Sequence, residues 1–211
     1  GRTDVWREGG RAPGWSAAAT RLDAQAGYVN YPDVALDAAG NATVVWEQWD
    51  GTRNQALARR ATAGGGWDAA PTPLDGAGDP SVGRVRVALG PGGDGLAYWT
   101  LDDRTGVRAR RLVGGAWQDA ETVAQGTSIY EAEARIAPDG RIVLAWTDGQ
   151  DAWVRTCAGG AWDAAATRVS ADAETVRLRT WTMAMDRSHG RVLVMWKIGR
   201  ASCRERVYSG V

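Results

Sequence analysis

The sequence lacks several residue types that would mark particular classes of protein. Phenylalanine is absent, Lys197 is the only lysine and His189 is the only histidine among 211 residues. One histidine and two cysteines, Cys157 and Cys203, provide neither a metal-binding cluster nor a disulfide framework. The 25 basic and 25 acidic residues cancel, whereas nucleic-acid-binding proteins usually carry a basic surplus. We therefore expect no metal, no cofactor and no nucleic-acid partner.

Long apolar runs and an N-terminal targeting segment are also missing. No run approaches the length of a membrane-spanning helix, so we expect no membrane partner. No secretory signal opens the sequence, and Gly1 begins in the middle of a repeated pattern. This start predicts that the chain is a fragment of a longer protein.

Tryptophan and glycine, by contrast, are abundant and periodic. A glycine followed six residues later by tryptophan recurs four times, with the tryptophans 53, 47 and 50 residues apart. A second tryptophan follows a glycine-rich turn, at spacings of 52, 50 and 45 residues. Two interleaved columns with one period indicate a structural repeat of about 50 residues. The columns are Trp46, Trp99, Trp146 and Trp196, and Trp15, Trp67, Trp117 and Trp162.

Each repeat predicts four short strands and no helix. The first strand alternates apolar and polar residues, as in 84–89, and ends in a turn such as 137–140. The second, such as 142–146, is continuously apolar, which is typical of a strand covered on both faces. A polar Asp/Gly hairpin leads to the third strand, and a Gly-Gly turn leads to the fourth.

Four strands in about 50 residues, repeated, indicate an all-β fold of β-propeller blades. The sequence predicts complete antiparallel blades near 28–76, 81–125 and 130–170. Residues 1–23 and 176–197 each match half a blade. We expect a piece of a larger ring, in which the repeated tryptophans pack between blades. The alternative is that the two halves complete one another and close a four-bladed ring.

The last residues break the repeat. Residues 198–207 carry no repeat signature and resemble the translation of a common sequencing adapter. We therefore divide the chain into propeller repeats at 1–197 and a non-native tail at 198–211. The alternative for the tail is a genuine arginine-rich extension that is exposed and disordered.

The Gly-x5-Trp strand, the Asp-Gly hairpin and the Gly-Gly-x-Trp turn resemble the repeats of secreted bacterial propeller proteins, both sialidase-like and lectin-like. The resemblance covers 1–197 and implies an extracellular or cell-surface location. The Asp-box of sialidases, Ser-x-Asp-x-Gly-x-Thr-Trp, does not occur, and neither does the Gly-His…Trp-Asp signature of WD40 repeats.

One face of the expected propeller gathers aromatic and acidic residues. Loops that enter a blade's first strand share this face with the hairpins between second and third strands. Aromatic rings there can stack on a sugar ring, and acids and an arginine can hydrogen-bond its hydroxyls. The candidate ligand-binding residues are Tyr31, Trp49, Asp50, Arg84, Asp102, Tyr130, Asp148, Asp151 and Trp181.

Simpler interpretations of the same residues remain open. Asp-Gly is ordinary hairpin chemistry, and single exposed aromatics are common. Acids in such hairpins also suit calcium, although none is spaced like a known calcium loop. The repeated Arg60, Arg110 and Arg155 could grip a glycan between blades, or could hydrogen-bond neighbouring carbonyls. We favour the structural role because no carboxylate repeats with them.

Catalysis has little support in the sequence. His189 lies in a turn on the opposite face, and no nucleophile elbow surrounds it. We therefore expect a non-catalytic binding or scaffold propeller, with a carbohydrate or a protein as ligand and no catalytic residues. The alternatives are a fragment of a sialidase-like glycoside hydrolase and a structural array for protein contacts.

Overall fold

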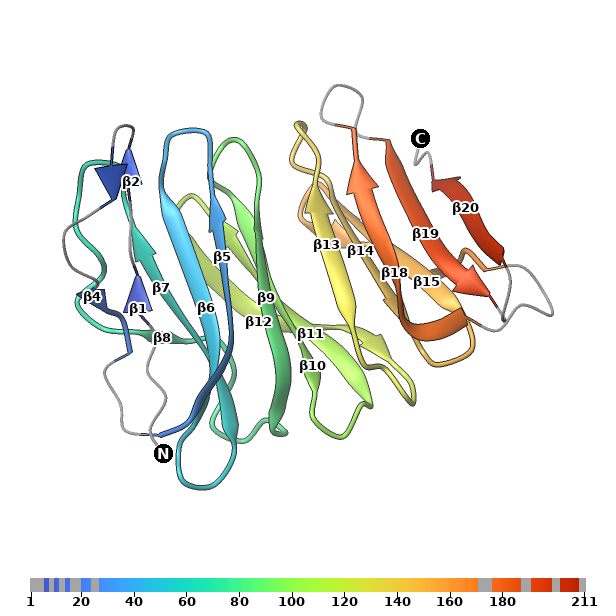
Figure 1. Ribbon diagram of the computed structural model, residues 1–211, viewed down its shortest axis with the longest axis horizontal. Coiled ribbons are helices and arrows are strands. Elements are labelled where there is room, and N and C mark those ends of the chain that lie inside the picture. The colour runs from blue at the N-terminus through green and yellow to red at the C-terminus, as the bar shows by residue number, and fades with distance from the viewer. Residues whose placement is uncertain are drawn as a thin grey trace.

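Figure 1 shows the computed structural model, which describes residues 6–7, 10–11, 14–15, 20–23, 27–170, 176–186, 191–198 and 202–208. Every regular element within these ranges is a strand, and the sheets are antiparallel, as predicted. The same ranges hold no helix that is long and apolar enough to cross a membrane.

Three complete blades form the centre of the molecule. Each sheet pairs consecutive strands in chain order, from an inner strand to an outer one. The fourth position of the third blade is divided between two short strands that both pair with β15.

The first blade contains β5 (Val29–Leu36), β6 (Ala42–Trp49), β7 (Asn54–Ala61) and β8 (Thr72–Pro73). The second contains β9 (Val82–Leu89), β10 (Gly95–Leu101), β11 (Gly106–Val113) and β12 (Ala116–Gln125). The third contains β13 (Ala132–Ile136), β14 (Ile142–Thr147), β15 (Ala152–Ala158), β16 (Ala161–Trp162) and β17 (Thr167–Arg168).

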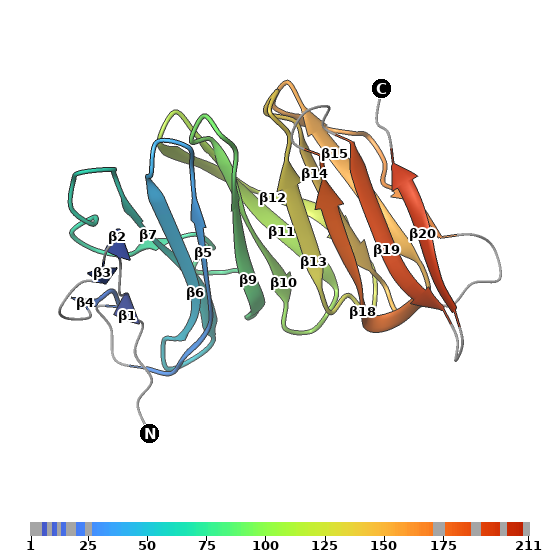
Figure 2. The same cartoon turned by 45° about the horizontal axis from the view of Figure 1, so that its top comes forward.

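Smaller sheets lie at the two ends of this row. β1 (Trp6–Arg7) pairs with β4 (Thr20–Arg21), and β2 (Gly10–Arg11) pairs with β3 (Gly14–Trp15). At the other end, β18 (Val176–Met185), β19 (Val192–Ile198) and β20 (Ser202–Tyr208) form a three-stranded sheet. Figures 1 and 2 place these end sheets on opposite sides of the molecule. The described strands therefore form an open row, and the two half blades do not close a four-bladed ring.

The segment expected to lie outside the repeats contains β20. This strand pairs with β19 in continuous register from Ser202 to Tyr208. The foreign origin of residues 198–211 stays a prediction, because strand pairing through backbone groups is available to most sequences.

The glycines of the repeat are fixed by backbone geometry. Gly40, Gly93 and Gly140 each end the turn into a second strand with φ between 85° and 89°. Left-handed backbone of this kind costs glycine nothing and penalises other residues, so the turn requires glycine there. The Gly114–Gly115 and Gly159–Gly160 pairs are left-handed at both positions, as a two-residue hairpin turn demands.

Trp99 and Trp146 of the first tryptophan column pack between blades, as predicted. Trp99 is fully buried beside Val45 and Ala58 of the preceding blade. Trp146 packs against Leu96 and the rest of a cluster that joins the second and third blades. Burial of one such side chain contributes about 1.5–3 kcal/mol. The second column lies nearer the surface, where Trp67, Trp117 and Trp162 are half-buried.

The inner strands β5, β9, β13 and β18 lie side by side along one surface of the row (Figures 1 and 2). Their N-terminal ends lie next to the hairpins that join second to third strands. The Trp49 amide donates to the Tyr28 carbonyl at 3.0 Å, and the Asp102 amide donates to the Ser81 carbonyl at 2.8 Å. The fold therefore brings the two sets of candidate site residues to one face.

Candidate functional site

A chain of polar and aromatic contacts crosses three blades at this face. The Arg84 guanidinium lies 4.9 Å from the centre of the Tyr31 ring, and its Nη1 donates to Glu131 Oε1 at 2.8 Å. Tyr31 is on β5, Arg84 on β9, and Glu131 immediately precedes β13. Tyr31 keeps 51% of its surface exposed, so its ring remains open to a ligand. We call these three residues the rim cluster.

The backbone holds Tyr31 in an unusual conformation. Its φ is 48°, and the register between β5 and β6 shifts across Asn30 and Asp33, which marks a bulge. Bulges re-aim side chains and are common beside functional sites. Arg104 and Ser128, with φ of 63° and 61°, are the other non-glycine residues with positive φ in the described chain. Such conformations cost about 1–3 kcal/mol each and concentrate at ligand sites.

A second arginine–tyrosine pair lies on the same face. Arg104 Nη1 donates to the Tyr130 hydroxyl at 2.7 Å, and its guanidinium lies 4.2 Å from the ring centre. The Ile129 amide donates to the Arg104 carbonyl at 3.1 Å, which fixes the β10–β11 hairpin against the loop before β13. Tyr130, a candidate from the sequence, is thus already held by a neighbouring cation.

The hairpin acids mostly cap their own turns. Asp50 Oδ1 accepts from the amides of Thr52 and Arg53 at 2.7 and 2.9 Å. The hydrogen bond from the Arg53 amide is the main reason that the pKa of Asp50 is lowered. Asp148 Oδ1 accepts from the amides of Gln150 and Asp151 at 3.0 and 2.8 Å. Hairpin capping therefore occupies two of the predicted ligand acids.

Two other predicted acids lie in different surroundings. Asp151 Oδ1 accepts from Arg168 Nε at 2.8 Å and from the Ser170 hydroxyl at 2.6 Å, which joins the hairpin to the end of the outer strand. Asp102 makes no side-chain hydrogen bond within the described residues. Trp49 is 38% exposed beside its hairpin.

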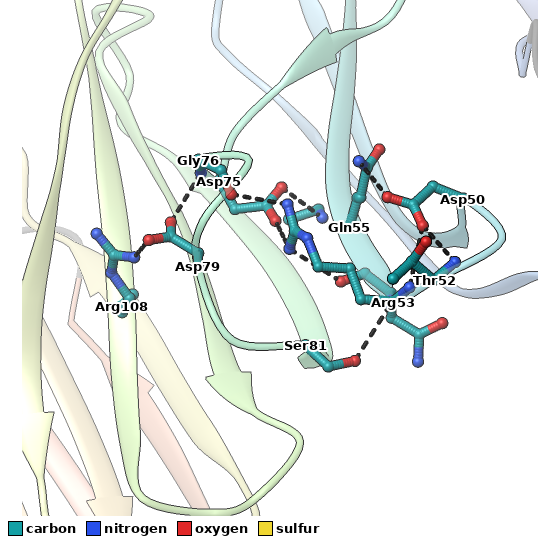
Figure 3. A network of polar contacts seen from close by, with 11 residues as sticks. Asp50, Thr52, Arg53, Gln55, Asp75, Gly76, Asp79, Ser81 and Arg108 are labelled. Carbon is teal, nitrogen blue, oxygen red and sulfur yellow. Dashed lines mark hydrogen bonds and ion pairs between the residues drawn. The ribbon is translucent and has the colours of Figure 1, made fainter.

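A polar network locks the connection from the first blade to the second (Figure 3). Arg53 Nη1 pairs with Asp75 Oδ2 at 2.5 Å, and its Nη2 donates to the Gly76 carbonyl at 2.7 Å. Asp79 accepts from the Gly76 amide and pairs with Arg108 of β11. Arginines of two blades thus hold the connecting segment 75–81, so the network around Asp50 and Arg53 is structural.

Glu47 was missed as a site residue because sequence comparison of the repeats showed it only as an exception. Thr100 and Thr147 take its place in the other blades. Its side chain is 4% exposed, and Asn30 Nδ2 donates to its Oε1 at 3.3 Å. Burial raises the pKa of Glu47 to about 7, opposed by the hydrogen bond from Asn30 and assisted by the charge of Asp102.

Below the rim cluster, a cavity of about 340 Å³ opens between the inner strands. We call it the inner pocket. Trp181 of β18 lies here rather than in the rim cluster, and Glu131 belongs to both sites. Tyr98 is almost fully buried, and its hydroxyl accepts from the Ala134 amide at 3.0 Å. Burial raises the pKa of Tyr98. The lining residues are Asp33, Arg86, Val87, Tyr98, Glu131, Ala132, Glu133, Arg135 and Trp181.

The repeated arginines act as clamps between blades, with one correction. Arg110 donates to the carbonyls of Gln118 and, at 2.9 Å, Pro73 of the preceding blade. Arg155 donates likewise to Asp163 at 2.8 Å and to Val123 at 2.7 Å.

In the first blade this position belongs to Arg59, not Arg60. On the neighbouring strand, Arg59 lies opposite Val44, which is two residues before Trp46. Arg110 and Arg155 lie opposite the residues at the same distance before Trp99 and Trp146. It donates to the carbonyls of Asp68 at 2.7 Å and Leu22 at 2.6 Å. The turn before Trp67 is one residue longer than in the later repeats. Counting seven residues back from the tryptophan therefore gives Arg60 instead of Arg59.

The part of the chain that the structure describes contains no cluster of side chains suited to bind a metal ion. No three histidine, cysteine or acidic side chains lie close enough there to hold an ion. Cys157 is buried, and burial raises the pKa of its thiol. His189 lies outside the described residues.

Comparison with solved structures relates the chain to propellers, while no family model and no curated protein matches it. A variant of AofleA from Arthrobotrys oligospora superposes with a TM-score of 0.54 and 16% identity, over 86% of this chain and 53% of that one. An α-L-arabinofuranosidase from Fusarium graminearum gives 0.53 and 12%, over 85% and 61%. NanB sialidase from Streptococcus pneumoniae gives 0.52 and 10%, over 88% and 31%.

These similarities establish the fold and nothing finer. The chain is an array of β-propeller blades of the type found in sialidases and other propeller glycosidases. It spans less than two thirds of each of the three matched chains.

Proposed function

We propose that the chain is a carbohydrate-binding propeller without catalytic activity, acting outside the cell. The rim cluster carries this proposal, because it holds an exposed tyrosine ring, an arginine and a carboxylate in mutual contact. A ring offers an apolar face to the C–H groups of a sugar, and the charged groups hydrogen-bond its hydroxyls. One solved neighbour, an arabinofuranosidase, is a complex with an iminosugar inhibitor. That ligand agrees with the proposed class.

A pair of tyrosines provides the test. Tyr31 and Tyr28 are similarly exposed, at 51% and 55%, and only Tyr31 contacts Arg84. The complete chain, Tyr31→Ala and Tyr28→Ala are applied to a glycan array. We expect the Tyr31→Ala variant to lose about tenfold or more in affinity, as for removal of a central aromatic contact, and the Tyr28→Ala variant to bind as the original. Absence of any glycan binding, or equal loss in both variants, would contradict the proposal.

Glycoside hydrolysis is the second candidate, and Glu47 is the observation that favours it. A carboxyl that keeps its proton near neutral pH beside a second carboxylate meets the requirement for a general acid in glycoside cleavage. Hydrolysis of any of a panel of chromogenic glycosides, abolished by Glu47→Gln, would support this candidate. A glycan bound without turnover would support the first proposal instead. A protein ligand without glycan affinity would favour the scaffold alternative.

The proposal also restricts the functional protein to the repeats at 1–197 and treats residues 198–211 as foreign. Sequencing the gene across the codon for Lys197 tests it. A reading frame that continues into further Gly-x5-Trp repeats supports the division, and a frame that encodes the tail as written contradicts it.

A further inference from the structure

Arginines pair with two of the three carboxylates that line the inner pocket. Its lining includes two arginines, Arg86 and Arg135, and three carboxylates, Asp33, Glu131 and Glu133. Arg135 pairs with Glu133, which also accepts from the Met183 amide at 3.2 Å. Glu131 forms an ion pair with Arg84 of the rim cluster. With Arg84 included, three arginines balance three carboxylates, and Asp33 and Arg86 are the two charged groups of the lining without an ion pair in the described chain.

Three hydrogen-bond donors of the pocket lining have no acceptor in the described chain, namely the Arg86 guanidinium, the Tyr98 hydroxyl and the Trp181 indole nitrogen. The Arg86 guanidinium makes no hydrogen bond or ion pair with any residue that the structure describes. The Tyr98 oxygen accepts from the Ala134 amide, so its own hydrogen is free to donate, and no described acceptor receives it. Tyr98 is 3% exposed, so its hydrogen needs an acceptor inside the pocket, which a water molecule or a ligand hydroxyl supplies.

An acceptor with spare capacity lies beside these donors. Asp33 Oδ2 accepts from the Val87 amide at 3.0 Å, and its Oδ1 has no partner in the described chain. Asp33 and Arg86 both line the pocket. Trp181 contributes an apolar surface from β18.

We infer that the inner pocket binds an uncharged saccharide unit through two neighbouring hydroxyls, and that it discriminates against acidic sugars. One hydroxyl donates to Asp33 and accepts from Arg86, and the next accepts from Tyr98, while the ring lies against Trp181. A sugar carboxylate would bring a negative charge beside Asp33, the carboxylate of the lining without an ion pair in the described chain, in surroundings partly shielded from water. The cavity volume lies near the lower end of ligand pockets, about 300–1,000 Å³, which suits a terminal sugar unit. This inference rests on the proposed carbohydrate function and names its ligand class.

Matched sugars test the charge. Binding of the complete chain to glucose- and galactose-terminated probes is compared with binding to the corresponding glucuronate and galacturonate probes. We expect the neutral member of each pair to bind at least about tenfold more tightly, the effect of one unfavourable charge contact. The Asp33→Asn variant removes one negative charge, so the ratio of its affinities for neutral and acidic probes should be smaller than that of the original chain.

Two arginine variants test the position. Arg86→Met removes the unpaired guanidinium from the pocket, and Arg191→Met, at an exposed arginine outside the pocket lining, serves as the matched control. Because Arg86 has no partner in the described chain, its replacement should leave the melting temperature unchanged and reduce binding of neutral probes about tenfold or more.

The outcomes separate this inference from the proposed function. Tighter binding of acidic probes, or full binding by Arg86→Met while Tyr31→Ala is impaired, overturns the inner-pocket inference and leaves the rim function intact. Absence of binding to every probe overturns both.

Discussion

Replacing Glu47 with glutamine should change how stability depends on pH. The carboxyl is 4% exposed, and its pKa in the folded chain is about 7, against 4.5 for the free side chain. Between these values the folded chain holds a proton that the unfolded chain has released. The contribution of Glu47 to the free energy of unfolding is therefore fully present below this interval. It decreases as the pH rises through the interval and is lost above about pH 7.

The magnitude follows from the same difference. A shift of this size corresponds to about 3 kcal/mol at most, and water near the rim reduces the expected loss to about 2 kcal/mol. Glutamine has the same shape and accepts the Asn30 hydrogen bond without ever carrying a charge. The Glu47→Gln variant should therefore be more stable than the original at about pH 8 and nearly equal to it at about pH 4.

Urea denaturation of both chains at the two pH values measures this effect. The difference between the variants, taken at each pH, cancels the contribution of every other titrating group. Parallel pH dependence in the two chains would refute a protonated Glu47, and so would a Glu47→Gln variant that is less stable at the higher pH.

Three further changes test other parts of the structure. Arg59→Met should lower the free energy of unfolding by about 2 kcal/mol, because it removes hydrogen bonds to three carbonyl groups, and Arg60→Met should lower it by about half as much; urea denaturation compares them. Equal costs would contradict the corrected register. Trp99→Ala, at a fully buried site between blades, should cost about 3–5 kcal/mol, and Trp117→Ala at a half-buried site less, as measured by the same method. Tyr31→Gly should relieve about 1 kcal/mol of backbone strain while reducing glycan binding, and a lower melting temperature would contradict the strain argument.

The blade architecture was predictable because its signals are local. Glycine at 40, 93 and 140 marks a turn that only left-handed backbone satisfies, and six residues later a tryptophan falls on the strand face that packs against the preceding blade. Both features repeat within each 50-residue unit, so no knowledge of long-range contacts was needed. The register of Arg59 was not predicted, because the repeats were aligned on their tryptophans and the extra residue in the turn before Trp67 displaces every position counted back from it.

The site was predicted less well, for an equally physical reason. Tyr31 and Arg84 were identified from their place at the start of inner strands, and the structure brings them into contact. Asp50 and Asp148 were chosen for their chemistry, and their oxygens are largely used by their own hairpins. Glu131 carried no repeat signal and was missed, although it joins the rim cluster to the inner pocket.

The sequence by itself determined the strands, the turns and the existence of blades, because backbone hydrogen bonding and side-chain alternation act over a few residues. Only the tertiary structure decided which side chains meet between blades. Tyr31, Arg84 and Glu131 lie 53 and 47 residues apart in the chain and become neighbours through the sideways packing of three sheets. The same packing places Arg86, which has no partner among the described residues, in a pocket lined also by Asp33 and Glu133 of the neighbouring blades.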